Sequence, residues 1–158
     1  MWDELLLYIT IFVLAAVPWI EILVVIPFGI AIGLNPILVG ILSFLGNAFP
    51  IYLIVVGYKR FQEWWAARRG KAFVNPADES WSTGRRARAM QIMQKYGVPG
   101  LSLASPLLIG AHLGAILTLI VGAPKRQIIG WMFFSLAIWT IGITIVSFFG
   151  IGWLTSLW

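Results

Sequence analysis

Hydrophobic and polar positions divide the chain into two long apolar blocks with a polar segment between them. The first block, residues 5–58, contains one charged residue, Glu21, and the second, residues 97–149, contains only Lys125 and Arg126. Apolar runs of roughly 18 residues or more indicate helices that span a membrane. The pattern therefore predicts an all-α integral membrane protein built as a single membrane domain.

Both blocks are interrupted. In the first, two thirteen-residue apolar arms, 5–17 and 22–34, flank a break at 18–21. At about 1.5 Å per residue, each arm reaches roughly 20 Å, which is shorter than a ~30 Å hydrocarbon core. Because Asn-Pro at 35–36 then marks a turn, we expect a re-entrant helical hairpin, which enters and leaves on one side, followed by a full span at 37–57.

The second block has breaks at 99–100 and 105–106 and ends in a span at 128–149. The two halves thus share an order of proline, proline, Gly-x-x-x-Gly, proline and span, which is typical of inverted-repeat transporters. We predict a first repeat at 1–58, a basic loop at 59–95 and a second repeat at 96–158. The expected hairpin breakers are Pro18, Pro27, Gly29 and Gly33 in the first half, and Pro99, Pro106, Gly110 and Gly114 in the second.

Positive charge is concentrated between the halves. The net charge is +5, and nine of the eleven Lys and Arg residues lie between 59 and 95. The positive-inside rule places this loop in the cytoplasm, and its segments 58–70 and 85–96 are predicted to be amphipathic interfacial helices. The rule explains the cations without a nucleic-acid partner.

The hairpin arrangement also places Lys125 and Arg126 on the cytoplasmic side and both termini outside. A plain four-helix bundle of 5–26, 37–58, 101–123 and 128–149 would place that pair outside, which violates the charge rule.

Glu21 is the main candidate for chemistry. An acid deep in hydrocarbon costs roughly 2.5–3.5 kcal/mol on insertion scales, so it usually faces a protein interior or a cavity. Prolines flank it at 18 and 27, which resembles the broken-helix sites of transporters. Desolvation favours its neutral form, so we expect Glu21 to exchange a proton for substrate. The alternative is an acid near a helix end whose carboxylate reaches the interface.

Other polar residues are expected to form one layer with Glu21. Trp19 offers an aromatic face to a cation, and Asn47 lies at mid-depth, where a structural interhelical hydrogen bond is the alternative. The remaining candidate substrate or ion ligands are Ser102, Ser105 and His112, with Thr140 as a further member.

Several kinds of site are not expected. A single histidine without cysteine is not a metal site, and no cofactor motif is present. Because no nucleophile lies near a general base and no phosphate loop occurs, we do not expect an enzyme.

Two segments, 17–33 and 95–115, resemble the two halves of the small multidrug export protein family, which is similar to the DedA (VTT-domain) superfamily of membrane proteins with two facing re-entrant hairpins. Glu21 with Pro27 and Gly33, Gly46-Asn47, and Tyr96-Gly97 with Pro106 carry the resemblance. The chain departs from the family's usual Pro-Leu-Pro-Gly-Thr-Gly run at 106–110, and it has no arginine between 97 and 124. The resemblance implies a bacterial or archaeal cytoplasmic membrane protein.

The function expected is proton-coupled export of small amphipathic or cationic compounds. A DedA-like translocase or scramblase of lipids or lipid phosphates is one alternative, and a membrane scaffold that does not transport is another. Besides the bilayer and a substrate, a second copy is a possible partner, because four membrane elements make a thin wall around a pathway.

Overall fold

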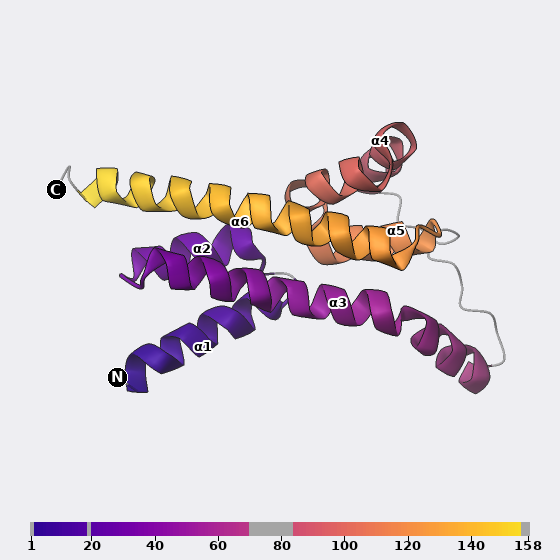
Figure 1. The fold of residues 1–158 in the computed structure, drawn as a ribbon, viewed down its shortest axis with the longest axis horizontal. Coiled ribbons are helices and arrows are strands. Elements are labelled where there is room, and N and C mark those ends of the chain that lie inside the picture. The colour runs from indigo at the N-terminus through magenta and orange to yellow at the C-terminus, as the bar shows by residue number, and fades with distance from the viewer. Residues whose placement is uncertain (1, 19, 70–83, 156–158) are drawn as a thin grey trace. The chain divides into compact units, whose positions relative to one another are not determined.

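The computed structural model describes residues 2–18, 20–69 and 84–155, and their regular structure is helical (Figure 1). The helices are α1 (Trp2–Ala16), α2 (Ile22–Ala31), α3 (Pro36–Arg69), α4 (Gly84–Leu108), α5 (Ala111–Ile120) and α6 (Lys125–Thr155). The prediction of an all-α chain is confirmed. Two segments, Pro36–Tyr58 and Lys125–Ile151, are long and apolar enough to cross a membrane.

The chain divides into two compact units. The first unit comprises Met1–Pro50 and Phe133–Trp158, and the second comprises Ile51–Met132. Fully buried aliphatic side chains form the core of each unit: Ile11, Ile22, Ile26 and Val39 in the first, and Val55, Leu101, Ala115 and Ile128 in the second. Large apolar side chains on the two long segments, such as Ile37 and Val146, are exposed, as expected of helices surrounded by hydrocarbon.

In the first unit, α1 and α2 contact each other across the break at 17–21. Pro18 lies in this break, and α2 begins where the backbone N–H of Val25 donates to the carbonyl oxygen of Glu21, at 3.2 Å. The helices of this unit approach closely because glycine, which has no side chain, lies at the contacts. A Cβ at Gly29 would lie 2.8 Å from Val39 Cγ1, and one at Gly46 would lie 3.0 Å from Ala15 Cβ.

In the second unit, α4 contacts α5. Gly97 interrupts α4 with non-helical backbone angles (φ 66°, ψ −159°), so residues 98–108 form a second helical segment. Pro99 lies in the first turn of that segment, where its missing N–H has no helical partner to lose. Gly110 (φ 91°) separates α4 from α5, and a Cβ at Gly114 would lie 2.7 Å from Ser105 Oγ.

Some predicted breakers lie inside helices. α2 continues through Pro27, so the prediction that this proline ends a helix is wrong. Proline removes one backbone hydrogen bond, and a membrane helix tolerates this loss when its surroundings compensate. Pro106 lies in the last turn of α4, which ends at Leu108 rather than at 105–106. Gly29 and Gly114 are also helical, and they allow close packing rather than a break.

Two turns have the same hydrogen-bond pattern. α2 ends in a turn at Gly33 (φ 86°), and α5 ends in a turn at Gly122 (φ 84°), 89 residues later. In both turns the glycine N–H donates to the carbonyl three residues earlier at 3.0 Å, and the following N–H donates to the carbonyl five residues earlier at 3.2 Å. Each turn requires a positive φ, which glycine adopts without steric cost.

The next long helix begins three residues after each of these glycines, at Pro36 and at Lys125. The turn at Gly33 and the turn at Gly122 thus have the same local geometry, and the predicted pairing of Gly29-x-x-x-Gly33 with Gly110-x-x-x-Gly114 stays a prediction.

α3 is a single helix from Pro36 to Arg69. The helix continues through Gly57 and Tyr58, so the backbone has no break where the sequence predicts a boundary between a membrane span and an interfacial helix. The side chains on which the amphipathic interpretation of 58–70 and 85–96 depends lie largely outside the described residues.

Gly114→Ala should destabilise the protein. The added methyl group would overlap with Ser105, which lies on packed helix, and overpacking of this kind typically costs about 1–3 kcal/mol. We expect a lower midpoint of thermal unfolding for the purified protein in detergent. Gly130→Ala is the matched control, because a Cβ there meets no atom within 4 Å. An unchanged midpoint for Gly114→Ala would contradict the close packing of α4 on α5.

Candidate functional site

Glu21 is buried at the start of α2. Only 7% of its surface is exposed, and its backbone is extended (φ −82°, ψ 176°). Its carbonyl oxygen accepts the N–H groups of Val24 and Val25, at 3.0 and 3.2 Å, whereas its carboxyl group does not cap the helix. The acid thus lies at the break between two short apolar helices, within the protein rather than at an exposed helix end.

The residue before α5 is Gly110, which has no side chain. Gly110 accepts the N–H of Gly114 at 2.9 Å, and this bond lies 89 residues after the one between Glu21 and Val25. The two short helices α2 and α5 therefore begin with the same backbone bond. A carboxyl group is present at the first of these positions only.

α3 carries two buried polar side chains that lack partners. Ser43 and Asn47 are fully buried, and neither Ser43 Oγ nor the two amide atoms of Asn47 form a hydrogen bond with the described part of the chain. A buried polar group without a hydrogen bond costs about 1–3 kcal/mol. Because the residues are four apart, they lie on one face of α3. This face is a candidate for contact with an ion, a substrate or water.

α6 carries a similar pair, Thr140 and Thr144, which we call the threonine pair. Thr140 is 7% exposed, and neither hydroxyl oxygen forms a hydrogen bond within the described residues. Helical threonines usually donate to a carbonyl three or four residues earlier. Thr118 does so to Ala115 at 2.8 Å, and Thr10 does so to Leu6 at 2.8 Å. The threonine pair therefore differs from Thr10 and Thr118, which bond to their own helices.

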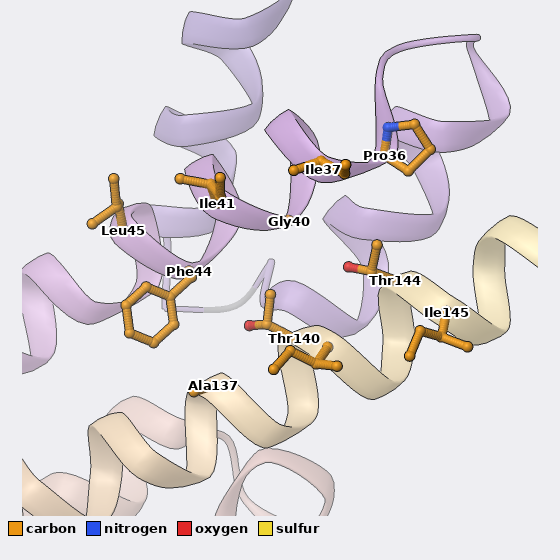
Figure 2. Close-up of a pocket in the computed structure, with 11 residues that line it drawn as sticks. Pro36, Ile37, Gly40, Ile41, Phe44, Leu45, Ala137, Thr140, Thr144 and Ile145 are labelled. Carbon is orange, nitrogen blue, oxygen red and sulfur yellow. The ribbon is translucent and has the colours of Figure 1, made fainter.

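A groove of about 380 Å³ lies between α3 and α6 within the first unit. We call it the α3–α6 groove, and the threonine pair lines it together with Gly40, Ile41, Phe44 and Ile141. The threonine side chains project from α6 toward α3 (Figure 2). Gly40 permits this approach, because a Cβ there would lie 3.0 Å from Thr144 Oγ1. The groove walls are otherwise almost entirely apolar.

The second unit contains Ser102, Ser105 and His112, all of them buried. Ser105 Oγ donates to the carbonyl oxygen of Ser102 at 3.0 Å and also lies 3.9 Å from Met132 Sδ. His112 lies in the first turn of α5. Among the described residues, no group of three His, Asp or Glu side chains could hold a metal ion.

The predicted site residues are divided between the units. Glu21, Asn47 and Thr140 belong to the first unit, and Ser102, Ser105 and His112 belong to the second. Trp19 lies outside the described residues. Sequence reasoning missed Thr144 and the groove itself. The available signal was the four-residue spacing of Thr140 and Thr144, opposite a glycine on another apolar helix.

Comparison with known families identifies the chain more closely. Residues 21–141 match the family described as "Putative small multi-drug export protein". The chain belongs to this family. Searches of curated proteins and of solved structures found no significant match.

The family assignment and the two long apolar helices make this small multi-drug export family member a membrane protein. The matched segment begins at Glu21 and ends one residue after Thr140. It therefore includes the buried acid, Ser43, Asn47 and most of the α3–α6 groove.

Asn47→Leu should raise the thermal stability of the protein. Leucine has the same branched outline as asparagine, and its substitution removes two unpartnered buried atoms that cost about 1–3 kcal/mol. Asn35→Leu is the matched comparison, and it should act in the opposite direction. Asn35 Oδ1 accepts the N–H of Ile37 at 3.0 Å and caps α3, so its loss should cost about 1 kcal/mol.

Unfolding midpoints of the two purified variants in detergent measure this difference in sign. A lower midpoint for Asn47→Leu would show that the amide does form stabilising bonds in solution.

Proposed function

We propose that the protein is a proton-coupled transporter that exports small amphipathic or cationic compounds, and that Glu21 is its coupling group. The observation that carries the proposal is a glutamate, Glu21, that is only 7% exposed and lies at a helix break, in a chain that belongs to a family of small multi-drug export proteins. Ionisable residues inside membrane segments are rare and usually mark transport pathways.

The coupling follows from the environment of the acid. Glu21 is buried where α2 begins, so a substrate that reaches it would meet the carboxyl group within the protein. A cationic substrate that reaches Glu21 would stabilise the carboxylate and release its proton. A proton from the other side would then displace the substrate. This exchange needs no covalent step and no cofactor.

We further propose that α1–α2 and the pair formed by residues 98–108 with α5 are re-entrant hairpins. α2 and α5 have ten residues each, which is about 15 Å and half of a hydrocarbon core. The shared turn pattern at Gly33 and Gly122 supports two copies of one motif.

A contact in the second unit supports the proposed orientation. Lys125 Nζ donates to the carbonyl oxygen of Val56 at 3.0 Å. Val56 lies near the end of the span Pro36–Tyr58, just before the basic loop. Lys125 thus begins α6 at the same end of α3 as the loop 59–95, as the hairpin arrangement requires, and the plain four-helix bundle would separate them. The positive-inside rule then makes this side cytoplasmic and the termini external.

The lipid translocase suggested by the DedA resemblance and the scaffold without transport are the competing proposals. They differ in what crosses the membrane. A translocase moves labelled phospholipid without a proton gradient, and a scaffold moves neither lipid nor dye.

Glu21→Gln should abolish proton-driven transport without unfolding the protein. Glutamine keeps the size of the side chain but cannot exchange a proton, and groups that transfer protons commonly contribute about 100-fold or more to a rate. We expect wild-type proteoliposomes with an acidic interior to accumulate ethidium, and the Glu21→Gln rate to fall to background. Glu4→Gln is the matched control, because Glu4 is exposed.

Equal ethidium uptake by wild type and Glu21→Gln would eliminate Glu21 as the coupling group. A different result would favour the lipid translocase. In that case neither wild type nor Glu4→Gln takes up ethidium, and the same vesicles scramble a fluorescent phospholipid.

The orientation is tested with single cysteines, because the natural chain has none. Asn35→Cys and Gln127→Cys place thiols at exposed positions, in the turn after α2 and in the first turn of α6. A membrane-impermeant maleimide should label position 35 only from outside and position 127 only from the cytoplasmic side. Labelling of both positions from outside would support the plain four-helix bundle instead.

A further inference from the structure

The α3–α6 groove has features of a binding site that the proposed coupling at Glu21 does not use. Its volume of about 380 Å³ is at the lower end of the usual range for small-molecule sites. Its residues come from the N-terminal half of α3 and the middle of α6, both within the first unit. Because no charged residue lines it, the groove would bind a charged group poorly.

The threonine pair gives this apolar groove a polar part. Thr140 is more than nine-tenths buried, and both hydroxyl oxygens lack partners within the described chain. Thr10 and Thr118 bond to carbonyl oxygens of their own helices, whereas the threonine pair makes no such bond within the described chain. Both side chains project toward α3 (Figure 2). A hydroxyl in this position can donate to or accept from a bound molecule.

We propose that the α3–α6 groove binds a single apolar chain with an uncharged hydrogen-bonding group, and that the threonine pair binds that group. The volume is suited to one chain rather than to a whole two-chain phospholipid. Gly40 leaves space beside Thr144, because any larger residue there would place its Cβ against the Thr144 hydroxyl. As a substrate site, the groove deepens the proposed export function and rests on it, and it selects neutral amphiphiles by hydrogen bonding.

The test uses two photoreactive probes, hexadecanol and hexadecane, each with a diazirine in the middle of its chain. Wild-type protein in phospholipid nanodiscs is illuminated with each probe, and the adducts are located by mass spectrometry. We expect adducts within 36–45 and 137–145, with the alcohol labelling about tenfold more strongly than the alkane at equal concentration, as hydrogen bonds to two hydroxyl groups imply.

The double variant Thr140→Val/Thr144→Val removes both hydroxyls and keeps the branched shape of the side chains. It should label equally with both probes, so that the preference for the alcohol is lost and alkane labelling is unchanged. Thr118→Val is the matched control, since Thr118 is buried but bonded to its own helix. Ile141→Trp fills the groove from its exposed rim and should abolish labelling at these positions by both probes.

Adducts outside the groove, or equal labelling of wild type by both probes, would overturn the proposal. Light scattering gives a second test. If wild type is a dimer that is not labelled in the groove, and Ile141→Trp is a monomer, this face is an interface between two copies and the proposal is overturned. Competition by phospholipid as strong as that by free hexadecanol would assign the groove to bilayer lipid and would also overturn it.

The two proposals can fail separately. Glu21→Gln should keep the alcohol preference, because Glu21 does not line the groove. If wild type is labelled in the groove but does not transport ethidium, the proposed coupling at Glu21 is refuted and the proposed binding site stands. If wild type transports ethidium but is not labelled in the groove, the binding site is refuted and the coupling stands.

Discussion

Inside hydrocarbon no solvent can satisfy a polar group, and this constraint limits where the chain can interrupt its helices. The break at Glu21 and the break at Gly110 each separate short helices that contact a partner helix in their own unit. The shared backbone pattern lies at the turns that follow α2 and α5, at Gly33 and Gly122. At the first break the buried residue is Glu21, whereas Pro18 is exposed, so the polar side chain is the one that the protein covers.

Some buried polar side chains bond to the backbone of their own helix, and others do not. In the second unit, Ser105 and Thr118 bond to backbone carbonyls of their own helices, which makes them compatible with an apolar core and leaves little capacity for a ligand. In the first unit, Asn47 and the threonine pair make no such bonds within the described chain. An unbonded buried group lowers stability, so Asn47 and the threonine pair are destabilising unless water or a ligand supplies the missing hydrogen bonds.

Local signals were enough to predict much of the fold. The Pro18–Glu21 break, the Asn35-Pro36 turn and the two long spans all follow from hydropathy and from residues that end helices. Pro27 was misjudged because a helix can continue through a proline when its surroundings compensate. Gly29 and Gly114 were misjudged as breakers because glycine serves both turns and close packing. Glu21 was identified by its isolation, whereas the α3–α6 groove depends on residues about a hundred positions apart and on rotamers of Thr140 and Thr144 that sequence does not reveal.

The continuous α3 helix has a consequence for the basic residues that follow the apolar segment. Its 34 residues correspond to about 50 Å of helix, and only Pro36–Tyr58 has the composition of a span. Because the helix runs on to Arg69, the first basic residues after Tyr58 are joined to the apolar segment by regular backbone rather than by a loop.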